Sequence, residues 1–181
     1  QCFDNDLVWC LVDVHRELRL TLLLRLRNVA LVLDQSTNEV LFEKNSEIAL
    51  PIASITKLMT SLVVVEAAQD LNELLLVTED DVDREKFSHS RLRVGSQLSR
   101  ANMLHIALMS SENKAISTLA KNHPGGLERF VETMNAKAKE LGMRDSHFLE
   151  PTGILSGNIS TASDVAILIS AAEKFPLIQQ P

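Results

Sequence analysis

Two short β-rich runs lie on either side of a polar turn in the first quarter of the chain. The runs are VALVLD at 29–34 and EVLFEK at 39–44, and the residues QSTN separate them. Apolar and β-branched residues around a short polar segment are typical of an antiparallel hairpin. The pattern of residues 1–28 leaves two interpretations open, because DVHRELRL repeats as a helix does whereas the leucines that follow alternate as in a strand.

Helical patterns dominate the rest of the chain. Residues 52–68 are apolar on most faces, which predicts a buried helix. Three further segments have helical spacing, namely RANMLHIALM (100–109), LERFVETMNAKAKELG (127–142) and STASDVAILISAAEKFP (160–176). Thr161 and Asp164 have the spacing of a capping box, and the charged residues 77–99 predict surface loops. Two strands followed by helices indicate an α+β domain whose helices cover a small antiparallel sheet.

Composition excludes several classes of function. The 181 residues are enough for one domain with a sizeable core. The net charge is -6 and no run of Lys and Arg offsets it, so nucleic acid is not an expected partner. The longest apolar stretches fall short of the roughly 20 residues that span a bilayer, so no transmembrane segment is predicted. Cys2 and Cys10 are the only cysteines, which excludes a disulfide framework but leaves one bridge between them open.

The histidines are candidates for metal ligands only if their spacing allows it. His15, His89, His105, His123 and His147 do not have the spacing of a metal site, so we expect neither a metal nor a cofactor. His105 lies in an apolar helical pattern and is interpreted as a core or rim residue.

The segment PIASITKLMTS, residues 51–61, places Ser54 and Lys57 three positions apart in apolar surroundings. Pro51 predicts that a helix begins before Ser54, so that Lys57 lies one turn later on the same face. A serine hydroxyl is a good nucleophile only when a base takes its proton, and burial lowers the pKa of a lysine towards that task. The alternative is a helix-capping serine followed by a surface lysine.

Ser111 and Asn113 form a second polar pair, at the end of the apolar segment MLHIALM. Ser111 could relay a proton between Lys57 and a leaving amine, and Asn113 could hold a substrate amide. An ordinary helix cap explains the same two residues. S-x-x-K followed in order by S-x-N is more specific than either motif alone.

Five segments in chain order resemble the low-molecular-mass penicillin-binding D,D-peptidases. They are LVLDQSTNEVLFEKNSEIALPIASITKLMTSLVVVEA, NMLHIALMSSENKAISTLA, MNAKAKELGM, FLEPTGI and NISTASDVAILISAA. The resemblance extends over residues 29–181 and is greatest to the D-alanyl-D-alanine endopeptidase branch of the family.

This resemblance implies a β-lactamase/D,D-peptidase-like (transpeptidase) fold and a serine acyltransferase that acts on peptidoglycan peptides in the periplasm, as an endopeptidase or a carboxypeptidase. Ser54 would be the nucleophile, Lys57 would accept its proton, and Ser111 and Asn113 would assist. The Ser54 N–H would provide half of the oxyanion hole. β-Lactams would acylate Ser54 as substrate mimics.

The chain departs from the family pattern in two places. No lysine begins K-T-G or K-S-G, the family's third motif, so we interpret the chain as ending before the C-terminal strands of the fold. Residues 1–28 match no family segment and are assigned as a leader, whereas residues 29–181 are the N-terminal and helical part of a D,D-peptidase domain. A serine β-lactamase and a non-catalytic or inactive fragment remain alternatives. Glu150 fits the peptidase pattern EPTG better than the role of a deacylating glutamate in class A β-lactamases.

The predicted hairpin raises a question of stability. An isolated two-stranded hairpin is at best marginally stable in water, and its edges invite further pairing. We therefore expect poor solubility, a partner chain, or a leader strand from residues 18–27 that covers the sheet.

Overall fold

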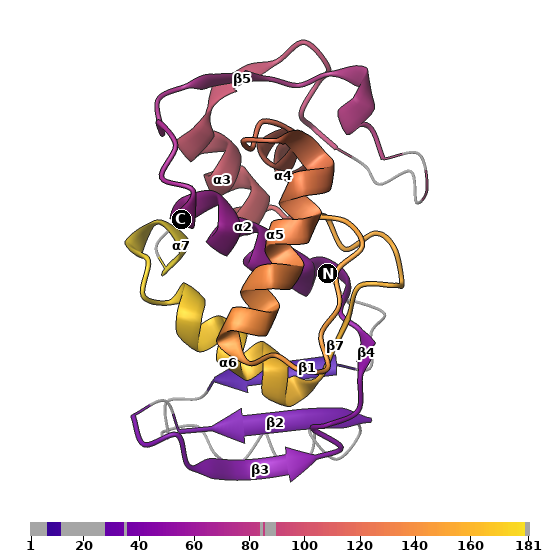
Figure 1. The fold of residues 1–181 in the computed structure, drawn as a ribbon, viewed down its shortest axis with the longest axis vertical. Coiled ribbons are helices and arrows are strands. Elements are labelled where there is room, and N and C mark those ends of the chain that lie inside the picture. The colour runs from indigo at the N-terminus through magenta and orange to yellow at the C-terminus, as the bar shows by residue number, and fades with distance from the viewer. Residues whose placement is uncertain (1–6, 12–27, 35, 84, 86–89, 180–181) are drawn as a thin grey trace.

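The first three strands form one sheet at the base of the molecule (Figure 1). The computed structural model describes residues 7–11, 28–34, 36–83, 85 and 90–179. Strands β2 (Val29–Leu33) and β3 (Val40–Lys44) pair antiparallel, which confirms the predicted hairpin. Asp34 closes the turn between them, because its Oδ1 accepts hydrogen bonds from the N–H groups of Ser36 and Thr37, each at 2.9 Å.

Strand β1 (Leu7–Leu11) runs parallel to β2 and pairs along its other edge. A strand from residues 1–28 therefore pairs with the edge of the hairpin, but it lies earlier in the chain than the predicted segment 18–27, which is outside the described residues. Cys2 is outside them too, so the bridge to Cys10 stays a prediction.

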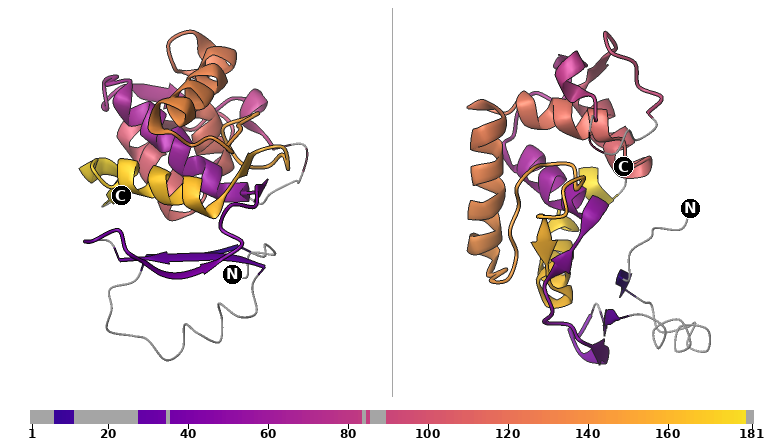
Figure 2. Two further views of the ribbon diagram at one scale, coloured as in Figure 1. Left: turned by 60° about the horizontal axis from the view of Figure 1, so that its bottom comes forward. Right: turned by 90° about the vertical axis from the view of Figure 1, so that its right-hand side faces the viewer.

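Helices form the layer above the sheet (Figure 2). They are α2 (Thr56–Glu66), α3 (Arg100–Met109), α4 (Asn113–Lys121), α5 (Gly126–Leu141), α6 (Ala162–Ala172) and α7 (Pro176–Gln179). Helix α2 packs against each of α3, α4, α5 and α6, and its Met59 and Leu62 are fully buried, which confirms the predicted buried helix. Helix α6 also contacts the sheet, where Ala162 packs with Val29 and Leu31. The α+β class is confirmed.

Two further pairs of short strands were not expected from the sequence. Strand β5 (Leu74–Leu76) pairs with β6 (Gln97–Ser99), and β4 (Leu50–Pro51) pairs with β7 (Ile159–Ser160). The interpretation of 77–99 as loops was therefore wrong at its last residues. These strands are too short to give a periodic signal in the sequence. They form because distant segments pair in the folded protein, which a local pattern does not reveal. The β4–β7 pair brings the segment that precedes β7 beside the segment that leads into α2.

The ends of α5 and α6 show how far local signals extend. Gly142 ends α5 in the left-handed conformation, as its position after the helical pattern predicted. Thr161 Oγ1 accepts the N–H of Asp164 at 3.0 Å, which confirms half of the predicted capping box. The Asp164 carboxylate instead accepts the Asp145 N–H at 2.9 Å and the Ser146 hydroxyl at 2.7 Å. Tertiary contacts thus redirect a side chain that the local pattern assigned to a cap.

None of the helices in the described part of the chain has the length and the apolar character needed to cross a membrane.

Candidate active site

Ser54 lies in a short 3-10 turn, η1 (Ala53–Ile55), which leads into α2. The α-helix therefore begins after Ser54 rather than before it, contrary to the prediction. Ala53 explains the difference, because its φ of +44° lies in the left-handed region and interrupts regular helix. The Ile52 N–H donates to the Asn158 carbonyl at 3.0 Å and anchors this entry. Backbone strain of this kind persists where the surroundings enforce it, often at functional sites.

Lys57 lies in the first turn of α2, and its amine reaches back to Ser54. Lys57 Nζ is 3.1 Å from Ser54 Oγ, the contact that the three-residue spacing predicted. The same nitrogen donates to the carbonyl oxygen of Thr152 at 2.7 Å. Only 3% of Lys57 is exposed, so the alternative of a surface lysine is wrong. An amine within hydrogen-bond reach of a serine hydroxyl has the geometry of a base beside a nucleophile.

Gly153 places its backbone directly against the peptide bond between Ala53 and Ser54. A Cβ at this glycine would lie 1.9 Å from the Ala53 carbonyl oxygen and 3.0 Å from the Ser54 nitrogen. Its φ of +84° also favours glycine. Thr152 and Gly153 are site residues that the sequence reasoning missed, although Pro-Thr-Gly is a turn signal.

Ser111 and Asn113 lie at the junction of α3 and α4. Ser111 has a φ of +53°, which lies in the left-handed region as that of Ala53 does. Asn113 is the first residue of α4, and the side chain of Glu112 caps this helix by accepting the Lys114 N–H at 3.2 Å. The helix-cap alternative for Ser111 and Asn113 is therefore wrong. Helix α4 packs against α2, the helix that carries Lys57.

A pocket of about 410 Å³ brings Asn113 to the same wall as Thr152. Thr152 is the residue whose carbonyl binds Lys57, so the pocket adjoins the Ser54–Lys57 pair. The other described lining residues include the acidic side chains of Asp80, Asp81, Asp83, Glu85 and Glu150. Ser54, Lys57 and Ser111 are not among the described residues that line it. Among the four predicted site residues, the structure thus joins Ser54 to Lys57 directly, places Asn113 in the lining of a pocket together with Thr152, and places Ser111 at the junction of α3 and α4.

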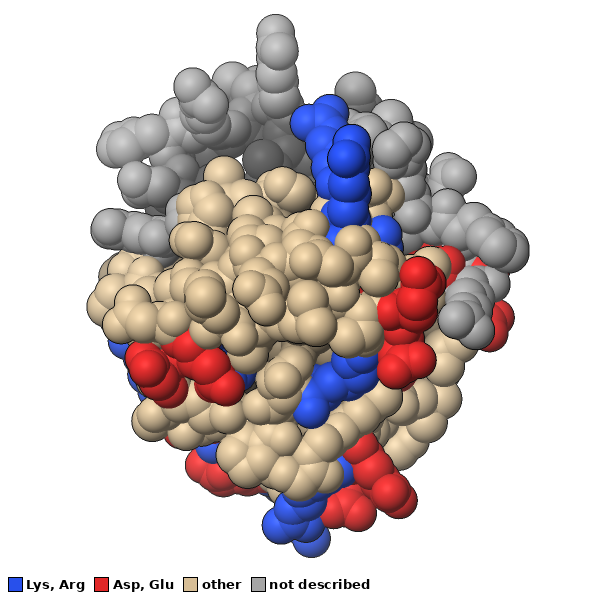
Figure 3. All heavy atoms as spheres, turned by 90° about the horizontal axis from the view of Figure 1, so that it is seen from above, with Lys and Arg blue, Asp and Glu red and all other residues tan. Residues whose placement is uncertain are grey.

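Charge on the upper face is mixed. Figure 3 shows small acidic and basic groups interspersed over the described residues that are visible from above. One acidic residue of the pocket, Asp81, forms an ion pair, since its Oδ1 lies 2.9 Å from Lys121 Nζ.

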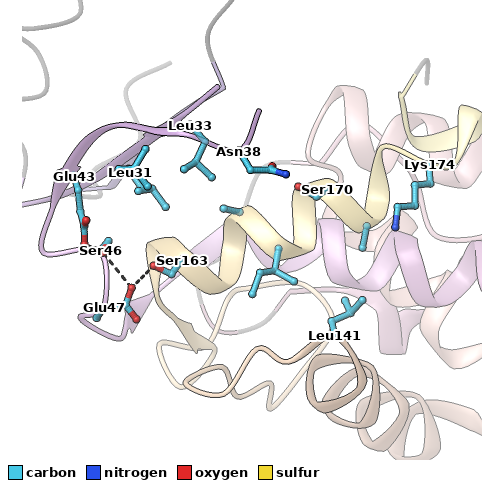
Figure 4. A pocket seen from close by; sticks show the side chains of 14 residues that line it. Leu31, Leu33, Asn38, Glu43, Ser46, Glu47, Leu141, Ser163, Ser170 and Lys174 are labelled. Carbon is cyan, nitrogen blue, oxygen red and sulfur yellow. Dashed lines mark hydrogen bonds between the residues drawn. The ribbon is translucent and has the colours of Figure 1, made fainter. Parts of the chain in front are cut away.

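A larger pocket, of about 540 Å³, lies between the sheet and α6 (Figure 4). Leu31 and Leu33 line its sheet side, and Leu141 lies across from them. At its rim, the carboxylate of Glu47 accepts hydrogen bonds from the hydroxyls of Ser46 and Ser163. None of the predicted site residues is among its described lining residues, so we place the candidate active site at Ser54 and not at this pocket.

The histidines that the structure describes are not arranged as ligands. His105 is exposed, which makes it a rim residue rather than a core residue. His123 packs edge-on against Phe130 with ring centroids 5.1 Å apart. Burial and the positive charges of Arg100 and Arg129 lower the pKa of His123. No group of three or more potential metal ligands occurs among the described residues.

Comparison with known proteins gives consistent matches. The S11 peptidase family, described as D-alanyl-D-alanine carboxypeptidase, matches residues 27–180. The D-alanyl-D-alanine endopeptidase of Pseudomonas aeruginosa is 48% identical over 151 residues, and that of Escherichia coli is 46% identical over 151 residues. Each alignment covers 83% of this chain and 49% of the relative. The chain therefore spans about half the length of these curated relatives.

Solved structures share the arrangement of helices and strands. The Streptomyces K15 DD-transpeptidase superposes with a TM-score of 0.73 at 27% identity, over 78% of this chain and 58% of that one. Penicillin-binding protein D2 of Listeria monocytogenes, in its cefotaxime-bound form, superposes with a TM-score of 0.72 at 28% identity, over 81% of this chain and 62% of that one.

Proposed function

Because the chain belongs to the D-alanyl-D-alanine carboxypeptidase family and has the D,D-peptidase fold, we propose that it carries the nucleophile of a serine D,D-peptidase. The observation that carries the proposal is the contact of 3.1 Å between Ser54 Oγ and the buried Lys57 Nζ. A nucleophile within hydrogen-bond reach of its base is the geometry that covalent catalysis requires.

In the first half of the proposed reaction, the Ser54 hydroxyl proton passes to the neutral amine of Lys57 while Oγ attacks the carbonyl carbon of a D-alanyl residue. The Ser54 N–H would stabilise the negative charge that develops on the carbonyl oxygen. The C–N bond then breaks, and the proton moves from Lys57 through the Ser111 hydroxyl to the leaving amine. An ester on Ser54 remains.

In the second half, water attacks the ester carbonyl. Lys57 takes a proton from this water, and the C–O bond to Ser54 breaks. The proton returns to Ser54 Oγ, and the peptide leaves as a carboxylic acid, which then loses its proton to solvent. Asn113 would hold the peptide amide at the pocket wall during both steps, as expected of a carboxamide with donor and acceptor groups.

The proposed substrates are peptidoglycan peptides, and the proposed place of action is the periplasm, where such substrates lie. β-Lactams would react in the same way, because opening the lactam C–N bond leaves an ester on Ser54. This part of the proposal is supported by the family match and by the antibiotic-bound state of the Listeria relative.

The test is to incubate the full-length protein with a fluorescent penicillin and locate the adduct by mass spectrometry. We expect one adduct, on the peptide that contains Ser54, and none in Ser54→Ala. Ser36→Ala is the matched control, since it removes an exposed serine in the hairpin turn and should label as the wild type does. An adduct at another residue, or no adduct, would refute the proposal.

The same experiment separates the serine β-lactamase alternative. A peptidase stays acylated for long enough to isolate the adduct, whereas a β-lactamase releases opened penicillin over many turnovers. Rapid loss of the adduct with stoichiometric excess of hydrolysed penicillin would favour the β-lactamase.

A further inference from the structure

The turn from Glu150 to Gly153 is folded around the carboxylate of its own first residue. Glu150 Oε2 accepts the Thr152 N–H at 2.6 Å and the Thr152 hydroxyl at 2.5 Å, while Oε1 accepts the Gly153 N–H at 2.6 Å. A carboxylate accepts hydrogen bonds and donates none, so it can bind several converging donors at once. Hydrogen bonds to a charged acceptor are also stronger than neutral ones.

Asn158 holds this carboxylate in place. Its Nδ2 donates to the Glu150 backbone carbonyl at 2.8 Å, to Glu150 Oε1 at 3.0 Å and to Thr56 Oγ1 at 3.1 Å. Its Oδ1 accepts the Leu149 N–H at 2.8 Å. Asn158 is fully buried, so these contacts form without competition from water.

The turn also contacts the chain segment that carries the catalytic candidates. The Thr60 hydroxyl donates to the Pro151 carbonyl at 2.7 Å, and Lys57 Nζ donates to the Thr152 carbonyl at 2.7 Å. Gly153 packs against the peptide that precedes Ser54. Three successive residues of the turn, 151–153, therefore each contact either the segment that leads into α2 or its first two turns.

We propose that Glu150 is a positioning residue for Lys57. Its carboxylate orients the Thr152 peptide so that the carbonyl oxygen holds one hydrogen of the Lys57 amine. This contact holds the amine nitrogen at 3.1 Å from Ser54 Oγ. This inference rests on the proposed function, because it assigns Lys57 as the base. Both oxygens of Glu150 are occupied by the turn, so the geometry gives it a role in holding the base and not in activating water.

The test compares Glu150→Gln with Asp34→Asn in the full-length protein. Both substitutions replace a carboxylate that accepts backbone N–H groups in a turn, but Asp34 lies in the hairpin and Glu150 beside Lys57. Acylation by fluorescent penicillin is followed at several concentrations. Three quantities are obtained: the limiting rate constant, the half-saturating concentration and the final labelled fraction.

We expect Glu150→Gln to lower the limiting rate constant by about 10- to 100-fold, the range that follows from misplacing a catalytic group by a fraction of an ångström to an ångström. The half-saturating concentration and the final labelled fraction should stay at their wild-type values. Asp34→Asn should change none of the three. A purely structural role for Glu150 would instead lower the labelled fraction and leave the rate constant unchanged.

A wild-type rate constant in Glu150→Gln, or a loss confined to the labelled fraction, would overturn this inference and leave the proposed function intact. If Glu150→Gln does not fold, Thr152→Val decides, because it leaves Glu150 unchanged and removes the hydroxyl that donates to its carboxylate and accepts the Ile154 N–H at 3.2 Å. That variant should lower the rate constant by a smaller factor, and an unchanged value would overturn the inference. A wild-type protein that is not labelled would overturn the proposed function and this inference together.

Discussion

The helical layer and the sheet layer of this molecule differ in how they use apolar residues. Met59, Leu119 and Phe130 in the helices are fully buried. In strand β3, by contrast, Val40 and Leu41 are about half exposed, at 51% and 48%. The cluster between the sheet and α6 is also much smaller than the main core. The helical layer can therefore support a precise site, because close packing permits few alternative positions for its side chains.

The two layers differ in their buried polar residues as well. Thr56, Lys57, Thr60 and Asn158 are buried in the helical layer, and each has hydrogen-bond partners. The carboxylate of Asp34 also accepts hydrogen bonds in the hairpin turn, but it is exposed to solvent. Buried networks of this kind specify one conformation, since an unpartnered polar group in the interior is costly. The predictions below test this contrast, from the largest expected effect to the smallest.

Gly153→Ala should have the largest effect on stability. The new Cβ would clash with the carbonyl carbon and oxygen of Ala53. These are backbone atoms, so they cannot move away without displacing Ser54. We expect a loss of more than about 4 kcal/mol, the range of exceptional single substitutions. Gly142→Ala is the matched control, because Gly142 has a φ of +85° and no atom within 4 Å of its Cβ position. Its cost should be only the left-handed penalty of about 1–2 kcal/mol. Denaturant unfolding measures both, and equal losses would contradict the close packing of Gly153 on the site.

Leu119→Ala tests the packing of the helical core. Leu119 lies in α4 with 0% exposure, so truncation leaves a cavity among side chains that cannot all collapse into it. We expect the free energy of unfolding to fall by about 2–5 kcal/mol. Chemical denaturation with an unchanged m-value is the measurement, and a loss below about 1 kcal/mol would show that the core is looser than its burial suggests.

The same substitution in the sheet should have little effect. Leu41 lies in β3 next to the register shift opposite Val32 and Leu33, and it is half exposed. We expect Leu41→Ala to change the free energy of unfolding by about 0.5 kcal/mol or less, as for other surface positions. A loss as large as that of Leu119→Ala would indicate that another surface covers β3 in solution.

The smallest effect should come from the hairpin carboxylate. Hydrogen bonds from Ser36 and Thr37 lower the pKa of Asp34 to about 2, from an ordinary value of 3.8. The folded state therefore favours the ionised form, so the stabilisation is complete above the unfolded pKa and is lost as the pH falls from about 4 to about 2. Thermal unfolding of wild type and Asp34→Asn should differ slightly at neutral pH, and the difference should disappear across this range. A difference that persists at pH 2 would contradict the role of the ionised carboxylate.

Several parts of the fold could be predicted from the sequence because they depend on local chemistry. The β-rich runs around QSTN predicted the β2–β3 hairpin, and the apolar block after Pro51 predicted the buried helix α2. The three-residue spacing predicted contact between Ser54 and Lys57, because residues one helical turn apart share a face. The division into a leader and a peptidase domain stays a prediction.

Other features depend on contacts between distant parts of the chain. The left-handed Ala53 is held by Asn158 and Gly153, about a hundred residues later, and it moves the start of the helix past Ser54. The pairing of β4 with β7 and the redirected Asp164 carboxylate arise in the same way. Local pattern carries no information about such contacts, because their energy comes from groups that meet only after folding.

The sequence by itself therefore determined that Ser54 and Lys57 meet and that a buried helix carries Lys57. Only the tertiary structure decided what holds the Lys57 amine. The carbonyl of Thr152 reaches Lys57 because the Glu150 carboxylate and the Asn158 carboxamide fold that turn against α2. The physical reason is that spacing along a helix brings two side chains together, whereas the orientation of a buried amine depends on the polar groups that replace water around it.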